Sequence, residues 1–247
     1  MVVFKDVSKC YGNREVLSSV SFNIEARSVC GIMGKNGAGK STLLNIIHGQ
    51  QDYQGEVSIC NQSPKDYKKN HFERLFFLDD NPHIYDYLTP LEYVQFCLET
   101  KGIHFYQKEQ LLSDLIHILD LKSAEKSLIK NFSFGMRRKV KLLAVLLSEP
   151  QLLLMDEPTL GLDAPSVVVF KRLVVEFAKQ GTTIIVASHE PDFLKSICSH
   201  ILILHDKKIV YDNSNVQGES VDLNKLYLNI LDLQMDDKIN ALFQSSR

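Results

Sequence analysis

The chain has 247 residues, of which 45% are hydrophobic and 23% are charged, and its formal net charge at pH 7 is -2. This composition is typical of a globular domain with its own core, and a near-neutral charge without a basic stripe argues against a nucleic-acid-binding surface. No apolar run approaches the roughly 18–20 residues that span a bilayer, the N-terminus does not resemble a signal peptide, and the five scattered cysteines suit a reducing cytoplasm.

The N-terminal part is expected to be rich in β-strands. Short apolar or alternating runs at 2–8, 15–24 and 55–60 are separated by turn residues and predict an antiparallel β subdomain. Another apolar run, at 28–33, leads directly into a glycine-rich loop, and the pattern after this loop predicts a helix that ends near Gly49. Strand, glycine loop and helix form the arrangement of a P-loop.

The middle of the chain, about residues 86–150, is expected to be helical. Thr89 precedes a proline and stands three residues before a glutamate, which is the pattern of a helix start. Leucines at four-residue intervals from Leu111 predict a second helix, and Ser133 opens a third with apolar residues at helical spacing. This part is therefore expected to form a helical subdomain.

The last part alternates again between buried strands and helices. Continuous apolar runs at 152–155 and 183–187 predict strands, and residues 167–177 predict the helix between them. Such alternation indicates an α/β fold with a mainly parallel core sheet that is covered on both faces. We expect one domain over residues 1–212, followed by a tail, 213–247, whose pattern is weak.

The glycine loop, residues 34–42, matches the phosphate-binding pattern G-x-x-x-x-G-K-[ST] in full. Its glycines let successive backbone N–H groups curl around a phosphate chain, and the following helix N-terminus adds partial positive charge. Lys40 is predicted to reach the β- and γ-phosphates, and Ser41 to place its hydroxyl on Mg²⁺. The expected nucleotide-binding residues of the loop are Asn36, Gly37, Ala38, Gly39, Lys40, Ser41 and Thr42.

Two adjacent carboxylates, Asp156 and Glu157, end the buried run at 152–155. Buried carboxylates are costly unless a cation or a substrate uses them. We predict that Asp156 binds Mg²⁺ and that Glu157 polarises the water that attacks the γ-phosphate. His189 ends the next strand and is predicted to sense the γ-phosphate, so the expected catalytic residues are Lys40, Glu157 and His189.

The order and spacing of these motifs over residues 1–212 resemble the nucleotide-binding domain of ABC transporters. The segment 132–136 resembles the family signature, usually L-S-G-G-Q, and the segment 160–163 resembles the D-loop. The residues that the resemblance adds to the nucleotide site are Tyr11, Ser133, Gly135 and Asp163. In the family an aromatic ring at the position of Tyr11 stacks on adenine.

Three places depart from the family pattern. Phe134 replaces a signature glycine and Met136 replaces the signature glutamine, while Asp80 stands where the family has the Q-loop glutamine. We expect Asp80 still to contact Mg²⁺ or water. The glycine usual in the last hairpin is also replaced, around residues 206–208. The S-x-G-M form with basic residues after it resembles exporters of the ABC-2 kind, including antibiotic and peptide self-resistance pumps.

The resemblance implies an enzyme that binds ATP and Mg²⁺ and hydrolyses ATP. In the family the signature faces the nucleotide of the partner, so it implies a head-to-tail dimer with a second copy or a homologous ATPase subunit. It further implies a separate transmembrane permease, transport in the direction of export, and a place on the cytoplasmic face of the membrane, without a nucleic-acid partner. The alternatives are a non-transport ABC ATPase that regulates cell-envelope machinery, and a P-loop GTPase or kinase, for which no N-K-x-D motif is present.

Overall fold

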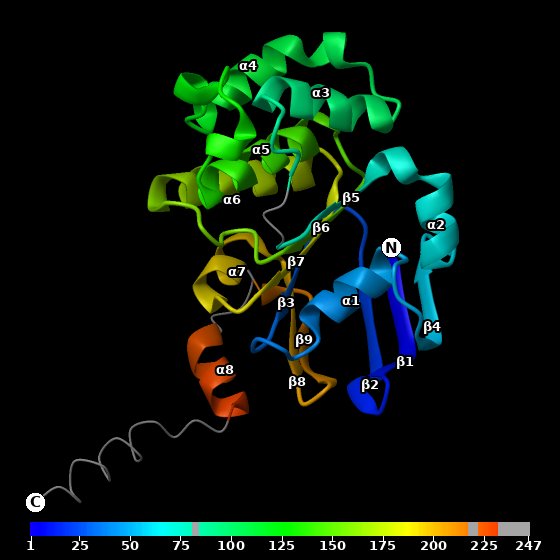
Figure 1. Ribbon diagram of the computed structural model, residues 1–247. Helices are drawn as coiled ribbons and strands as arrows, with labels where there is room; N and C mark the ends of the chain where they lie inside the picture. Colours follow the sequence, from blue (N-terminus) through cyan, green and yellow to red (C-terminus); the bar gives the residue numbers. More distant parts are fainter. Residues whose placement is uncertain (81–83, 217–221, 232–247) are drawn as a thin grey trace, which may run out of the picture.

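The computed structural model describes residues 1–80, 84–216 and 222–231. Two sheets and a separate group of helices make up the structure (Figure 1). The smaller sheet is antiparallel with the strand order β2-β1-β4, which confirms the predicted N-terminal β subdomain. Its strands are β1 (Val2–Tyr11), β2 (Arg14–Ile24) and β4 (Gln54–Ile59).

The larger sheet has the order β5-β6-β7-β3-β8-β9 and is parallel except for β9, which pairs antiparallel with β8. Its strands are β3 (Val29–Met33), β5 (Leu75–Leu78), β6 (Leu152–Asp156), β7 (Thr183–Ser188), β8 (His200–His205) and β9 (Lys208–Asn213). The predicted mainly parallel core sheet is confirmed. Because β6, β7 and β3 are neighbours, the loops that follow these strands meet at one edge of the sheet.

Residues of the central strands alternate between two hydrophobic cores, as the period of two in a strand requires. In β7, Ile184 and Val186 face the core that contains α6 and α7, while Ile185 and Ala187 face the core shared by α1 and the antiparallel sheet. Every residue of β7 is buried, so helices cover both faces. These helices are α1 (Lys40–Ile47), α2 (Pro64–Asn70), α6 (Ala164–Lys179) and α7 (Pro191–Ile197).

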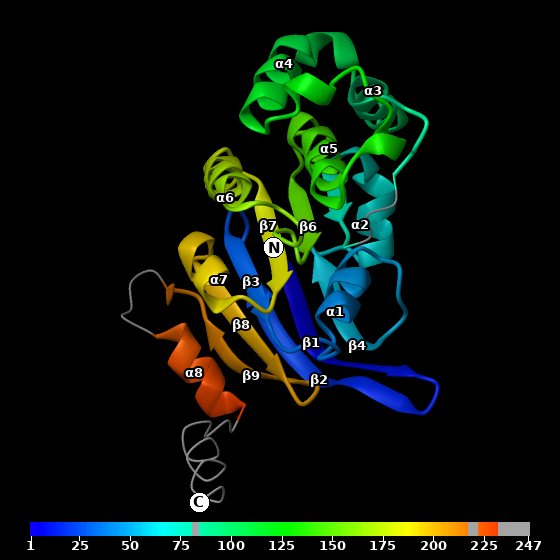
Figure 2. The same cartoon turned by 60° about the vertical axis from the view of Figure 1, so that its left-hand side comes forward.

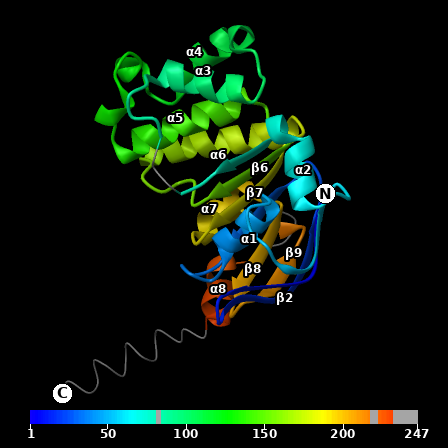
Figure 3. The same ribbon diagram turned by 45° about the vertical axis from the view of Figure 1, so that its right-hand side comes forward.

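The helical subdomain lies at the β5 side of the larger sheet, above α6 in Figure 3. It is built from α3 (Pro90–Thr100), α4 (Glu109–Ile118) and α5 (Phe134–Leu147). Thr89 caps α3 through a reciprocal pair of hydrogen bonds with Glu92, as predicted from the sequence. Four 3₁₀ turns, one of them before β5, occupy Phe72–Arg74, Phe105–Lys108, Lys122–Ala124 and Ile129–Asn131.

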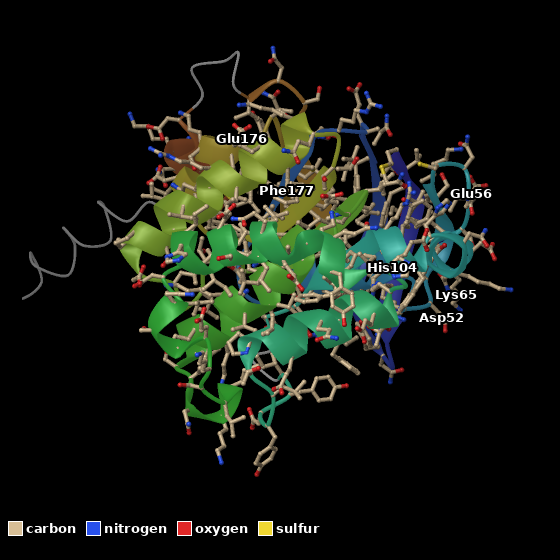
Figure 4. The ribbon with its side chains drawn as sticks, turned by 90° about the horizontal axis from the view of Figure 1, so that it is seen from above. Asp52, Glu56, Lys65, His104, Glu176 and Phe177 are labelled. Carbon is tan, nitrogen blue, oxygen red and sulfur yellow. The ribbon has the colours of Figure 1, made fainter. Side chains whose placement is uncertain are left out.

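The view from above separates the two flanks of the molecule (Figure 4). Glu176 and Phe177 of α6 lie on one flank, and Asp52, Glu56 and Lys65 lie on the other. Lys65 Nζ is 2.8 Å from Asp52 Oδ1, which ties α2 to the segment before β4. The helical subdomain lies nearest the viewer in this view, in front of the sheet.

Part of the tail forms a helix that the weak pattern did not predict. Asp222 caps α8 (Leu223–Ile230), and Asn224 Nδ2 donates to Asp192 Oδ1 at 2.8 Å, so α8 packs on α7 (Figure 2). The rest of the predicted tail at 217–221 and 232–247 lies outside the described residues. In the parts of the chain that the structure describes, no helix has the length and apolar character needed to cross a bilayer.

The last hairpin turns without glycine. Asp206 and Lys207 have φ values of 43° and 70°, in the left-handed region that glycine usually occupies. The departure noted in the sequence around residues 206–208 therefore changes the residues of this turn and leaves the β8–β9 pairing in place.

Candidate functional site

The phosphate loop connects β3 to α1. Gly39, the residue before α1, has a φ of 112°, a conformation that L side chains rarely adopt, so the turn into the helix requires glycine. Among the described residues no side chain caps α1. The first N–H groups of α1 therefore lack a side-chain acceptor, which fits a phosphate chain as their partner.

Lys40 is buried at the start of α1 and points at the end of β6. Its Nζ donates to the carbonyl of Gly34 at 2.8 Å and to that of Lys35 at 3.3 Å, and lies 3.2 Å from Oε1 of Glu157. The side chains of Lys40 and Glu157 are only 6% and 16% exposed. Partners separated by more than a hundred residues thus form a shielded ion pair at the edge of the sheet, where the Coulomb attraction is weakly screened.

Glu157 has a second set of contacts on the other side of its carboxylate. Ser188 Oγ donates to Oε2 at 3.2 Å, and His189 Nδ1 lies 3.0 Å from the same oxygen. Oε1 is buried and receives no hydrogen bond from the described residues, although the Lys40 ammonium is nearby. A buried acceptor that receives no hydrogen bond is rare, and here the Lys40 ammonium at 3.2 Å is the charged partner of this oxygen.

Asp156 is the candidate Mg²⁺ ligand at the end of β6. Burial raises the pKa of its carboxyl, as do the charges of Asp80 and Glu157, whereas a hydrogen bond from Ser41 lowers it. Ser41, Asp80 and Asp156 line one pocket of about 420 Å³ together with the phosphate loop. Oxygen donors of this kind suit Mg²⁺.

The protein supplies only part of a coordination shell. Among the described residues, no three His, Cys, Asp or Glu side chains come together as a metal-holding group. Mg²⁺ usually keeps several waters and binds substrate phosphates in addition to one or two carboxylates. The donor set therefore fits an ion that arrives with a nucleotide.

The side of the phosphate pocket next to β1 and β2 includes one residue that sequence analysis missed. Tyr11, at the end of β1, is 45% exposed, and its ring lies under Lys9 Nζ at 4.9 Å from the ring centroid. It does not line the phosphate pocket, whereas Arg14 does, and Arg14 also lines a neighbouring pocket of about 690 Å³ beside the β8–β9 turn. Arg14 follows the turn at Gly12–Asn13, and no sequence motif gives a role to the residue after such a turn. The sequence alone therefore did not point to Arg14.

The signature and the D-loop lie together, away from the phosphate loop of the same chain. Ser133 caps α5 by accepting a hydrogen bond from Met136 N at 3.3 Å, and Asp163 caps α6 by accepting from Ser166 N at 2.8 Å. A Cβ atom on Gly135 would lie 2.3 Å from the Gly161 carbonyl oxygen, so the two loops touch. Ser133, Gly135 and Asp163 are absent from the residues that line the phosphate pocket.

Arg138 is a second residue that the sequence did not single out. It lies in α5, is 5% exposed, and donates to backbone carbonyls just after β6. The only signal in the sequence is its spacing, four residues before the buried Leu142, which places it on the inner face of the helix.

The comparison with known families shows which family the chain belongs to. The sequence profile described as ABC transporter matches residues 17–160, more than half of the chain. The chain belongs to the ABC transporter family. It is an ATP-binding subunit of an ABC transporter, and it hydrolyses ATP with Mg²⁺ as the partner ion of the nucleotide.

The matches to individual ABC transporter proteins cover most of this chain. The putative ABC transporter ATP-binding protein AlbC of Bacillus subtilis (strain 168) is 32% identical over 240 residues, which cover 92% of this chain and 96% of AlbC. The bacitracin transport ATP-binding protein BcrA of Bacillus licheniformis is 29% identical over 83% of this chain and 67% of BcrA. The methionine import ATP-binding protein MetN of Clostridium tetani (strain Massachusetts / E88) is 28% identical over 90% of this chain and 70% of MetN.

A solved structure adds the oligomeric state of a relative. The ATP-binding cassette MJ0796, described as a dimer in a post-hydrolysis state bound to ADP and Pi, matches with a TM-score of 0.77 and 25% identity. The match covers 87% of this chain and 99% of MJ0796. ABC ATPase domains of this kind dimerise and work with transmembrane subunits.

Proposed function

We propose that this ABC ATPase is the motor subunit of an exporter, docked on the cytoplasmic face of a separate membrane permease. The S-x-G-M form of its signature supports export, as does its similarity to BcrA, whose name denotes bacitracin transport. The similarity to MetN, named for import, leaves direction as the point that experiment must decide.

The observation that carries the proposed chemistry is the cluster of Lys40, Glu157 and His189 beside the phosphate loop. Glu157 acts as the general base, accepting through Oε1 a proton from the attacking water. General-base assistance contributes roughly 10²–10⁴-fold to the rate. Lys40 moves its charge from Glu157 to the phosphates of the incoming nucleotide, and His189 orients Glu157 and contacts the γ-phosphate.

Three oxygen-bearing side chains are proposed to hold Mg²⁺. Ser41 and Asp156 approach the ion from α1 and β6, and Asp80 approaches from the segment after β5. When bound, Mg²⁺ neutralises charge on the phosphate oxygens. Asp80 brings a negative charge where the family usually has a neutral amide, and this charge offsets part of that neutralisation.

The proposed active form is a head-to-tail dimer. Ser133, Gly135 and Asp163 of one subunit face the nucleotide that the other subunit holds on its phosphate loop, and Tyr11 stacks on the adenine. The separation of these residues from the phosphate pocket within one chain supports this arrangement. The dimer partner is a second copy or a homologous ATPase subunit, and no nucleic acid is involved.

The proposed permease contact is a pocket of about 680 Å³ between the sheet and the helical subdomain. Its lining includes Phe72, Asp80, Tyr93 and Lys141, and exposed aromatic side chains of the 84–88 loop and α3 lie beside it. A groove that offers both apolar and charged side chains fits a short amphipathic helix of a membrane subunit.

The test is the oligomeric state of Glu157→Gln, measured by light scattering with and without ATP and Mg²⁺. We expect an ATP-dependent dimer that turns over very slowly. Ser133→Glu added to this variant should abolish the dimer, whereas Ser123→Glu, a matched charge at an exposed serine of the same subdomain, should not. Near-normal turnover of Glu157→Gln would rule out Glu157 as the base.

Direction is tested in the host cell. Loss of an export motor should raise the intracellular level of the transported compound and the sensitivity of the cell to it. Reduced uptake in the same experiment would instead show an importer.

A further inference from the structure

Arg138 joins the signature helix to the catalytic end of β6 inside one subunit. From the second turn of α5, its Nη2 donates to the carbonyl of Asp156 at 2.7 Å and to that of Glu157, and its Nε donates to the carbonyl of Pro158 at 3.1 Å. The side chain is buried, with 5% of the residue exposed. A single guanidinium thus holds three consecutive backbone carbonyls.

The segment held by Arg138 is a strained turn. Glu157 has a φ of 44°, in the left-handed region, which a non-glycine residue occupies only when its surroundings fix it. Two backbone hydrogen bonds also hold this turn: Glu157 N donates to Ala187 O at 2.9 Å, and Leu160 N donates to Glu157 O at 3.2 Å. Ser188 and His189 contact the carboxylate of Glu157, whereas Arg138 donates to the carbonyls of the turn. The planar fork of an arginine can reach several carbonyls where the point charge of a lysine cannot.

The charge of Arg138 also matches its surroundings. Burial lowers the pKa of its guanidinium, whereas the nearby carboxylates of Asp80, Asp79, Asp156 and Glu157 oppose that shift. A buried cation among acidic side chains offsets their mutual repulsion. Without the positive charge of Arg138, the repulsion between these carboxylates would be less fully offset.

We infer that Arg138 is a positioning residue that aims Glu157 at the hydrolysis site and transmits movement of the signature helix to it. This inference rests on the proposed role of Glu157 as the base. α5 begins one residue after Ser133, which in the proposed dimer faces the nucleotide of the partner. A shift of α5 on dimer closure therefore pulls on the turn that carries Glu157 of its own subunit, so each subunit's base responds to the partner's nucleotide.

The kinetic test compares Arg138→Gln and Arg138→Lys with the wild-type protein. We expect kcat for ATP hydrolysis to fall roughly 10²-fold in Arg138→Gln, the loss produced by a misplacement of about 1 Å. Arg138→Lys keeps the charge but not the fork, and its kcat should be intermediate. The KM for ATP and the affinity for ATP measured by calorimetry should change less than about three-fold in both variants, since Arg138 does not line the phosphate pocket.

Amide hydrogen exchange of the nucleotide-free protein gives a readout that does not depend on activity. Exchange over residues 157–162 should become faster in both variants, because the turn loses guanidinium hydrogen bonds to its carbonyls. Arg137→Gln is the matched control: Arg137 lies next in the helix but donates to the carbonyls of Phe132 and Lys130 and pairs with Asp86. In this control, exchange over residues 157–162 should equal that of the wild-type protein.

Two outcomes would overturn the inference. The first is unchanged exchange at 157–162 in Arg138→Lys, and the second is a parallel loss of ATP affinity and kcat, which would make Arg138 a general packing residue. If Arg138→Gln does not fold, Arg138→Lys alone decides between these results. Normal turnover of Glu157→Gln would contradict the proposed base, yet faster exchange in the Arg138 variants would still show that Arg138 fixes this turn.

Discussion

The phosphate loop and the signature region differ in how much of their chemistry one chain contains. Around the phosphate loop, Lys40 is buried, Glu157 is largely shielded from solvent, and the two side chains are already in contact. In the signature region, Ser133 and Asp163 are exposed and cap helices of their own chain, and Asp163 also lies 3.8 Å from Lys139 Nζ. The first region is assembled by folding alone, whereas the second would be completed by another molecule in the proposed dimer. Variants of the two regions should therefore fail in different ways.

The largest effect is expected for Lys40→Met in the phosphate loop. The substitution removes the cation for the phosphates and leaves Glu157 buried without its charged partner, so hydrolysis should fall by about 10²–10³-fold or more. ATPase assays measure the loss of hydrolysis, and calorimetry measures any loss of ATP binding. Lys65→Met, which breaks only an exposed ion pair on α2, should retain wild-type turnover.

The next effect is expected for Gly161→Ala in the D-loop. The φ of Gly161 is +78°, and an added Cβ would lie 2.2 Å from Cδ1 of the exposed Phe134, so this ring must turn away or the two loops must move apart. We expect a stability loss of about 1–3 kcal/mol and weaker ATP-dependent dimerisation, with ATP binding by the monomer retained. Thermal unfolding and light scattering check these outcomes.

A double-mutant cycle of Phe134→Gly and Gly161→Ala tests whether the Phe134 ring causes the expected stability loss. If the ring causes the clash, Phe134→Gly combined with Gly161→Ala should recover part of the loss, and the remainder should reflect the backbone strain at residue 161. Strictly additive losses would show that the two side chains do not interact.

A pH effect is expected at the far end of the phosphate-loop helix. Burial, with the nearby Lys68, lowers the pKa of His48 to about 4. As pH falls from about 6.5 towards 4, the unfolded chain binds a proton that the native state does not bind, so the folded state loses stability in this window. Because His48 is only partly buried, we expect at most about 1–2 kcal/mol. Comparing the thermal unfolding of His48→Gln with that of the wild-type protein at pH 7 and pH 5 isolates this loss, and equal pH dependence would contradict it.

The smallest effect is expected for Thr89→Ala in the helical subdomain. Removing the cap of α3 should cost about 1 kcal/mol, seen as a lower melting temperature. ATP affinity should stay unchanged, because Thr89 is remote from the phosphate pocket. A fall in ATP affinity would show that the helical subdomain and the phosphate loop are less independent than their contacts indicate.

The residues that sequence could predict are those whose neighbours are near in the chain or follow from parallel pairing. Lys40 and Ser41 belong to a local motif, and Asp156 and His189 meet it because β6, β7 and β3 are adjacent parallel strands. The order and spacing of these motifs were enough to predict the fold class and the family.

Other parts of the site depend on contacts that no local pattern encodes. Arg138 matters because its guanidinium reaches carbonyls about twenty residues away, and Arg14 because a β-turn brings it over the phosphate pocket. The packing of α8 on α7 likewise rests on tertiary contacts of a short helix. Short helices owe their stability to packing more than to propensity, so a weak pattern was all that the sequence could show.

The ion pair between Lys40 and Glu157 has a consequence for product release. In the structure the Lys40 ammonium pairs with the carboxylate of Glu157. If Lys40 binds the phosphates of ATP as proposed, the carboxylate and the phosphates compete for one ammonium, and each departure of a phosphate would be accompanied by the return of Lys40 to Glu157. This internal replacement for the lost ligand would weaken the retention of spent nucleotide.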